Sequence, residues 1–347
     1  MQVTTHPQAP EATSAGDSYR SRGRHGIRKH RRGRRGSGHR AQRGTEMVAS
    51  RKWFVLAPAI SLVGFGLAAP SDGPTDTGDT YADLPNSVTV VATIRDFKAY
   101  GESGGHPDFE RWTGGVRVGL VATDLDTEGK PVAASLTGQN LQTDYQDSSL
   151  QPINPALYDP ALGDIAGSLR AATDVKIDSV ESFAQWYRDG LHTASASVPI
   201  TFNRKPGTNT YIFDSATDDP FKTRGGFFPV DGLLYGNYAS TGHNFSFTTE
   251  METQFEFHRG EAQTFKFAGD DDVWVFIGGK LVIDLGGVHS AHAQVVNLDR
   301  LSWLTDGESY TLKIFHAERH TTQSNFKIET TLQMRQVQPP AAADLAD

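Results

Sequence analysis

The chain contains no cysteine, and after position 68 it contains few basic residues. The lack of cysteine excludes disulfides, so a large core or a bound metal must stabilise the fold in place of covalent links. Residues 1–68 hold 13 of the 33 Lys and Arg but only 3 of the 41 Asp and Glu, so the remainder carries a net charge of about −18. A chain this acidic should not bind nucleic acid or anionic lipid, and it offers many oxygen ligands for cations.

The sequence also lacks the signals of common hydrolases and metalloenzymes. We identify no nucleophile elbow, phosphate-binding loop or zinc motif. His316, Glu318 and His320 differ from the metalloprotease pattern, in which Glu follows the first His directly on a helix. Here the strand-like stretch 310–314 precedes them, so we predict a hydrogen-bonded polar row on one sheet face, with Arg319 anchoring a carboxylate from the opposite face.

No apolar run reaches the length of about 20 residues that a membrane span requires. The longest candidate, residues 53–67, is interrupted by Pro58, follows Arg51-Lys52 and ends at the small residue Ala68. Residues 47–68 therefore predict a cleaved signal peptide rather than a stable membrane span. Export without disulfides favours a bacterial envelope or secreted, extracellular protein.

Residues 1–46 form a basic segment with 11 Lys or Arg between Arg20 and Arg43. Three interpretations are open: an arm that binds an anionic surface, a twin-arginine signal, or a segment upstream of a true start at Met47, which we favour because a signal peptide should begin its chain. Residues 69–86, rich in Pro, Asp, Gly and Thr, predict a linker. Residues 87–335 are expected to form one domain and residues 336–347 a flexible tail.

Alternating apolar residues predict that strands dominate this domain. The pattern occurs at 88–94, 245–249, 255–257, 265–267, 273–277, 281–285, 310–314 and 326–334. Gly278-Gly279-Lys280 predicts a tight hairpin turn, and the series as a whole predicts an all-β antiparallel sandwich or barrel. One packed helix is expected between Asp178 and Gly190, with Val180, Phe183, Trp186 and Tyr187 on its apolar face. Residues 130–175 and 203–244 predict long loops.

Three consecutive aspartates, Asp270, Asp271 and Asp272, precede the most apolar of these strands. Carboxylates beside a packed core need backbone donors, an arginine or a bound cation. An oxygen-liganded metal, calcium before magnesium, is one solution, and a turn that supplies only backbone donors is the other. Asp272 is a further candidate ligand, as are Asp284, His289 and His292, which lie close to it in sequence.

The same region resembles a known family. The stretches 269–277, 279–289, 315–322 and 324–326, with 95–97, 106–110, 183–188 and 227–232, look like the signature of fibro-slime domains. That family is similar to the β-sandwich domain of anthrax protective antigen, called PA14, which also occurs in yeast adhesins. The resemblance implies a secreted or surface domain that often binds carbohydrate.

In the adhesin members, two adjacent aspartates joined by a cis peptide hold a calcium ion that also coordinates sugar hydroxyls. The matching pair here is Asp270 and Asp271, whereas Asp272 stands where the adhesins have a small residue. Their second calcium-binding loop, with its asparagine, has no definite match in the sequence. We place Asn325 with His316, Glu318, Arg319 and His320 in the structural polar row.

The sequence therefore predicts an exported, non-enzymatic, calcium-assisted domain for carbohydrate binding or adhesion, with a cell-surface glycan or polysaccharide as partner. Two alternatives are open: a metal-dependent polysaccharide hydrolase, and a structural matrix protein without a small ligand. The three aspartates are adjacent, so no second acid stands at a recognisable hydrolytic separation.

Overall fold

The computed structural model describes residues 79–335. The predictions for the basic segment 1–46, the signal peptide 47–68 and the tail 336–347 lie outside the described residues, as do residues 69–78 of the linker. Residues 79–86 of that linker are hydrogen-bonded to the domain. Asp79 accepts a hydrogen bond from Arg204 at 2.8 Å, and the Tyr211 hydroxyl donates to the Pro85 carbonyl.

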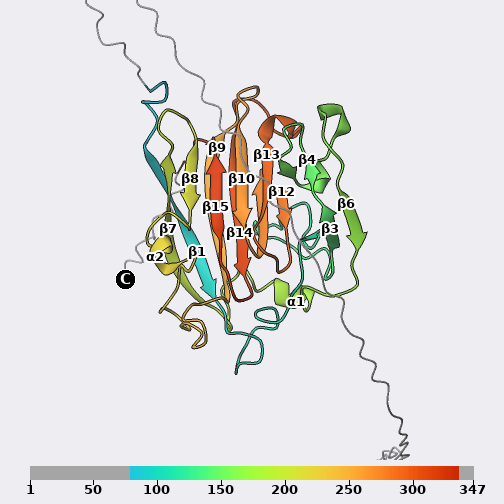
Figure 1. Cartoon of the computed structure of the whole chain (residues 1–347), viewed down its shortest axis with the longest axis vertical. Helices are drawn as coiled ribbons and strands as arrows, with labels where there is room; N and C mark the ends of the chain where they lie inside the picture. The colour runs from blue at the N-terminus through green and yellow to red at the C-terminus, as the bar shows by residue number, and fades with distance from the viewer. Residues whose placement is uncertain (1–78, 336–347) are drawn as a thin grey trace, which may run out of the picture. The chain divides into compact units, whose positions relative to one another are not determined.

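Strands are the predominant regular element of the domain, and helices are few and short (Figure 1). The strands are β1 (Ser87–Asp96), β2 (Arg117–Val118), β3 (Gln139–Thr143), β4 (Tyr145–Gln146), β5 (Pro152–Ile153), β6 (Ser168–Ala171), β7 (Ala194–Arg204), β8 (Tyr211–Asp214), β9 (Phe247–Glu256), β10 (Thr264–Gly269), β11 (Asp272–Ile277), β12 (Lys280–Leu285), β13 (His292–Asn297), β14 (Ser309–Glu318) and β15 (Phe326–Thr330). The helices are α1 (Val180–Phe183), α2 (Phe221–Arg224) and the 3₁₀ turns η1 (Pro155–Leu157), η2 (Pro160–Leu162) and η3 (Leu298–Arg300).

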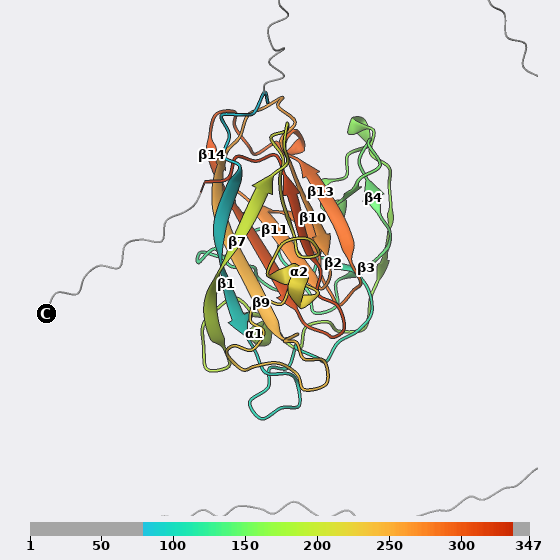
Figure 2. The same cartoon turned by 60° about the vertical axis from the view of Figure 1, so that its left-hand side comes forward.

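Ten strands form one antiparallel sheet in the order β12-β11-β14-β9-β1-β7-β8-β15-β10-β13. Figures 1 and 2 show these strands side by side. The sheet is nearly closed, because its two end strands meet through a side chain. Gln294 on β13 accepts a hydrogen bond from the Asp284 amide at 2.9 Å and donates to the Asp284 carbonyl at 3.2 Å. The predicted all-β antiparallel sandwich or barrel is confirmed.

Two cores explain the continuous apolar runs. Alternate residues of β11 and β14 face the inner core, which also holds phenylalanines from five other strands: Phe202, Phe213, Phe247, Phe255, Phe265, Phe267 and Phe326. The intervening residues Trp274, Phe276 and Phe315 face a second core, where they meet Phe183, Trp186 and Tyr187 of the α1 region. A strand covered on both faces reads as an unbroken apolar run, which accounts for residues 273–277.

The predicted hairpin is present. Ile277 pairs with Lys280 across a two-residue turn, and Gly278 and Gly279 have φ of 58° and 79°. Positive φ at both central residues is typical of a type I′ turn, which glycine adopts without steric cost.

The predicted helix is shorter than its pattern. Helix α1 ends at Phe183 because the chain then tightens, with the Trp186 amide donating to the Phe183 carbonyl three residues back. Phe183, Trp186 and Tyr187 are buried as expected, but Val180 is 50% exposed. Both α-helices among residues 79–335 have four residues, and neither has the length and hydrophobicity of a bilayer-spanning helix.

The two regions predicted as long loops contain short elements. Residues 130–175 hold strands β3 to β6 in two small sheets, and residues 203–244 hold β8 and helix α2. The long strand β7 was missed, because its sequence contains Pro199 and few large apolar residues. Over most of its length β7 pairs only with β1, and a strand with one free edge tolerates proline.

Candidate ligand-binding site

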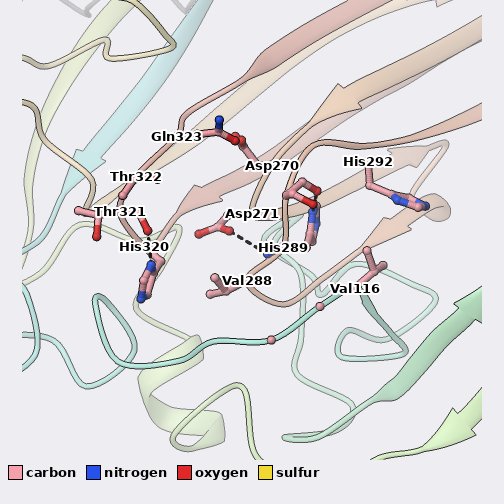
Figure 3. A pocket seen from close by; sticks show the side chains of 13 residues that line it. Val116, Asp270, Asp271, Val288, His289, His292, His320, Thr321, Thr322 and Gln323 are labelled. Carbon is pink, nitrogen blue, oxygen red and sulfur yellow. Dashed lines mark hydrogen bonds between the residues drawn. The ribbon is translucent and has the colours of Figure 1, made fainter. Parts of the chain in front are cut away.

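A cavity of about 430 Å³ opens where the strand ends of the large sheet meet three loops. Asp270 and Asp271 contribute from the β10–β11 junction (Figure 3). The remaining lining residues come from the β12–β13 loop, the β14–β15 loop and the segment before β2: Val288, His289, Ser290, His292, His320, Thr321, Thr322, Gln323, Gly114, Gly115 and Val116. None of the lining residues is Lys or Arg, so the cavity is acidic with three histidines.

The three aspartates have three different sets of partners. Asp270 accepts from the Asn325 backbone amide and from its Nδ2, each at 2.5 Å. Asp271 accepts from the backbone amides of His289, at 3.1 Å, and Arg319, at 3.0 Å. Asp272 lies outside the cavity lining.

Asp272 instead pairs with Arg319, and both side chains are fully buried. The Asp272 carboxylate accepts from the Arg319 Nε at 2.5 Å and from the Gly287 amide at 2.6 Å. Asp272, expected as a further candidate ligand, therefore serves the fold and does not line the cavity. Arg319 anchors a carboxylate of the neighbouring strand β11, not one from an opposite face as predicted.

The backbone at the aspartates differs from the cis arrangement that the resemblance implied. Among residues 79–335 the only cis peptide bond precedes Pro220, so the Asp270–Asp271 bond is not cis. Asp271 adopts a left-handed φ of 42°. Aspartate tolerates this region better than most residues, and the turn directs the Asp271 carboxylate to two backbone amides.

Burial sets the charge behaviour of the cavity wall. It raises the pKa of the Asp270 carboxyl. Burial, with repulsion from Asp272, raises the pKa of Asp271 well above its usual value. Burial also lowers the pKa of His289, whose ring contacts the carbonyls of Ser290, at 2.9 Å, and Leu285, at 3.3 Å. Two carboxylates thus face the cavity from positions that disfavour uncompensated negative charge.

The other predicted ligands divide between the cavity and the core. His292 lines the cavity and contacts Asp144 through its Nε2 at 2.8 Å. Asp284 is buried away from the cavity, where it accepts from the Gly119 amide at 2.7 Å and the Trp274 indole at 3.1 Å. It serves the packing of β11 against β12 and the segment at 119.

The predicted polar row is split by the end of β14. His316 and Glu318 are fully buried, and His316 packs against the rings of Phe227 and Phe326. Burial, with repulsion from Asp271 and Asp270, raises the pKa of Glu318 well above its usual value. His320 lies beyond the strand and lines the cavity, so the three residues do not share one face.

Asn325 is the site residue whose role the sequence did not reveal. It lies beside Asp270 because Gly269 of β10 pairs with Phe326 of β15. No local pattern predicts a pairing between segments this far apart, so Asn325 was assigned only to the polar row.

One motif was overlooked at the sequence level. Residues 101–105 read Gly-Glu-Ser-Gly-Gly, which matches the letters of a nucleophile elbow. In the structure this segment is an exposed turn that no helix follows directly, so the strand–turn–helix context of that motif is missing.

Side chains alone do not complete a metal site. Within residues 79–335, no group of three or more His, Asp or Glu side chains is arranged to hold a metal ion. A cation at Asp270 and Asp271 would take its other ligands from amide or carbonyl oxygens, water or a bound molecule.

The family model described as the PA14 domain matches residues 230–345, which include β9 to β15 and all three aspartates. The chain contains a PA14 domain. The predicted relationship is thereby confirmed, and the fold expected of a PA14 domain agrees with the antiparallel sheet described above.

Curated relatives of the PA14-containing chain include two proteins of Dictyostelium discoideum. Protein psiQ is 34% identical over 207 residues, which cover 55% of this chain and 20% of psiQ. Protein psiD is 32% identical over 260 residues, which cover 72% of this chain and 42% of psiD. The chain thus spans less than half the length of either relative. Both relatives are eukaryotic, so they do not support the predicted bacterial origin.

A solved structure, a β-glucosidase from Kluyveromyces marxianus in complex with glucose, covers 27% of this chain and 11% of its own. Its TM-score is 0.18 at 9% identity, which is too low to support an argument from fold.

Proposed function

We propose that this PA14 domain is an exported, non-enzymatic module that binds carbohydrate with the help of calcium and serves adhesion. One observation carries the proposal. Asp270 and Asp271 are buried at the wall of a 430 Å³ cavity, and neither forms an ion pair with a Lys or Arg side chain among residues 79–335. Buried carboxylates without a cationic partner are costly, and a bound cation removes that cost.

The donor set fits calcium. A carboxylate has about four lone-pair sites, and each oxygen of Asp270 and Asp271 receives one of the hydrogen bonds described above. Acceptor capacity therefore remains on both groups. Calcium prefers carboxylate and amide oxygens and accepts flexible geometry, which suits a site with two carboxylates and further ligands from outside the side chains.

In this proposal Asp270 and Asp271 hold the ion. Asn325, whose side chain donates to Asp270, takes the place of the asparagine in the family's second calcium-binding loop. Bound calcium supplies a positive centre for sugar hydroxyls. Backbone amides of the β12–β13 and β14–β15 loops fix the Asp271 carboxylate, and the Asn325 amide fixes that of Asp270, so the site is preorganised. The cavity volume lies within the range of about 300–1,000 Å³ that is usual for small-molecule sites.

The predicted signal peptide at 47–68 and the PA14 match favour a secreted or cell-surface location, where calcium is plentiful. Adhesion to a glycan also suits the strongly acidic domain, because neutral sugars do not depend on charge attraction.

Calcium binding is tested by isothermal titration of the full chain with CaCl₂. Wild type should bind with a Kd of about 10⁻⁴ to 10⁻³ M, as extracellular modules do. Asp270→Asn and Asp271→Asn should each lose binding by tenfold or more, about 1.4 kcal/mol, because one of the two carboxylate ligands becomes a neutral amide. Asp83→Asn, at an exposed position away from the cavity, is the matched control. No calcium uptake by wild type would contradict the proposal.

Sugar binding is tested on a glycan array with calcium and with chelator. We expect signals that chelator abolishes and that Asp271→Asn lacks. Signals that persist in chelator would remove calcium from the proposal, and their complete absence would favour the structural-matrix alternative. Release of reducing sugars from a polysaccharide panel would instead favour a hydrolase.

A further inference from the structure

A second cavity adjoins the first. Its volume is about 570 Å³, and its lining comes from the loop after β1 and the loop before β9: Ala99, Tyr100, Glu102, Glu110, Asn237, Tyr238, Ala239 and Ser240, together with Thr321. Thr321 also lines the cavity of Asp270 and Asp271. The two cavities therefore lie on either side of one residue.

Glu110, which lines the second cavity, fixes the segment around Thr321 that separates the two cavities. The Thr321 amide donates to the Glu110 carboxylate at 2.8 Å, and the Glu110 amide donates to the Arg319 carbonyl at 2.7 Å. These bonds join the loop after β1 to the β14–β15 loop. Figure 3 shows His320 and Thr321 of that second loop at the first cavity. Because both cavities share this bonded segment, their separation is fixed by the fold.

An exposed aromatic ring lines the second cavity. Tyr100 is 53% exposed, yet its ring is positioned by the Arg111 guanidinium, which lies 4.5 Å from its centroid. Arg111 is in turn held by Asp178 at 2.5 Å and lies 4.2 Å from the Trp112 ring. A ring that is ordered before binding offers a flat apolar surface at low entropic cost.

The second cavity is acidic. Its lining includes Glu102 and Glu110 and contains no Lys or Arg, and the nearby cation Arg111 is paired with Asp178. The Tyr238 hydroxyl, which also lines this cavity, is surrounded by the same acidic groups. Burial, together with repulsion from Glu110, Glu102 and Asp96, raises the pKa of Tyr238 well above its usual value. An acidic sugar would be repelled here, whereas a neutral one would not.

We propose that the two cavities are adjoining subsites for one oligosaccharide without acidic groups, which crosses Thr321 and stacks a sugar ring on Tyr100. This inference rests on the proposed function and adds the ligand class: a chain of at least two neutral sugar units. A single sugar would fill only one cavity.

The test measures affinity against chain length in calcium. Full-length protein is titrated with glucose, galactose and mannose, with their di- and trisaccharides, and with digalacturonate as an acidic counterpart. For the sugar that binds, the di- or trisaccharide should bind about tenfold more tightly than the monosaccharide, equivalent to about 1.4 kcal/mol. Digalacturonate should not show this gain.

Three variants locate the second subsite. Tyr100→Ala removes the exposed ring, and Ala239→Trp fills the cavity from an exposed turn. Both should abolish the gain with chain length while leaving calcium and monosaccharide affinity unchanged. Tyr235→Ala, at a tyrosine of similar exposure (42%) that lines neither cavity, should keep the gain.

The outcomes separate the two proposals. If a monosaccharide binds with calcium but longer chains bind no better, or if Tyr100→Ala and Ala239→Trp keep the gain, the second subsite is refuted and the proposed function stands. If digalacturonate gains as much as the neutral chains, the exclusion of acidic sugars is refuted. If no sugar binds in calcium, both proposals fail.

Discussion

Arg319 is predicted to be among the most important polar side chains for stability. Its side chain is fully buried, and its Nε pairs with Asp272, which is equally buried. Its Nη1 donates to the carbonyls of Lys176, at 2.9 Å, and Asp108, at 3.3 Å. The guanidinium also lies 4.6 Å from the centroid of the Trp186 ring. One side chain thus joins the start of the β14–β15 loop to β11, to two other loops and to the second core.

Arg319→Met would leave the Asp272 charge buried with only the Gly287 amide as partner. Removing one member of a buried pair costs about 3–5 kcal/mol. Each carbonyl that loses its donor costs about 1–3 kcal/mol more. These costs are not additive, because all the lost bonds come from the same guanidinium group. We expect a loss of about 5 kcal/mol in the free energy of unfolding, a large share of the total for a typical domain.

Arg117→Met is the matched control. Arg117 is also buried, at 2% exposure, but its partner Asp174 has a side chain that is 58% exposed and keeps a bond to Lys176. The Arg117 Nε and Nη1 have no hydrogen-bond partner among the described residues, so methionine would remove two unsatisfied donors. We expect a cost of about 1 kcal/mol or less, because a surface pair contributes little.

Equilibrium unfolding in urea, followed by tryptophan fluorescence, measures both costs. The double variant Arg319→Met/Asp272→Asn should recover at least about 2 kcal/mol relative to Arg319→Met, because the buried charge is gone while an acceptor for Gly287 remains. The reasoning is refuted if Arg319→Met costs no more than Arg117→Met, or if the double variant recovers nothing.

Three further predictions concern other parts of the domain. A few millimolar calcium should raise the Tm of wild type by about 2–8 °C in a calorimetric scan, and Asp271→Asn should melt alike in calcium and in chelator. Burial raises the pKa of Asp96 to about 6, above its unfolded value, so its contribution to the free energy of unfolding falls as pH rises from about 4 to 6. Relative to wild type, Asp96→Asn should therefore gain about 3 kcal/mol between pH 4 and pH 7 in urea titrations, and a pH-independent difference would contradict this. At the β11–β12 turn, Gly279→Ala should cost about 1–2 kcal/mol through its positive φ alone. Gly278→Ala should cost more, because its new Cβ would also lie 3.1 Å from the Tyr310 ring; equal costs would argue against that contact.

Local patterns in the sequence predicted the parts of the fold that depend on neighbouring residues. The Gly278–Gly279 turn and the alternating strands follow from backbone preference and from burial on one face or both. The strand β7 was missed because Pro199 is read as a break, whereas the free edge that tolerates it depends on which strands become neighbours. The order of strands in a sheet depends on residues far apart in the chain, so a short stretch of sequence does not predict it.

The candidate site shows the same division. The sequence predicted Asp270 and Asp271 as metal ligands, and the structure places both in the cavity lining. It did not place Asn325 beside Asp270, because that contact depends on the register of β10 against β15. It also gave no sign of the second cavity, whose lining comes from three separated segments.

The three adjacent aspartates have distinct roles because the backbone changes direction between them. Asp270 still follows β10 and meets the residue before β15, Asp271 turns through a positive φ toward two loop amides, and Asp272 begins β11 and faces Arg319. Neutralising a carboxylate, as in an Asp→Asn substitution, should therefore have different main effects at the neighbouring positions Asp271 and Asp272. At Asp271 it removes a repulsive buried charge and any cation that balances it, whereas at Asp272 it removes the partner of a buried arginine. The effects on stability and on the proposed cation binding should thus be separable in this motif, although the residues are identical and consecutive.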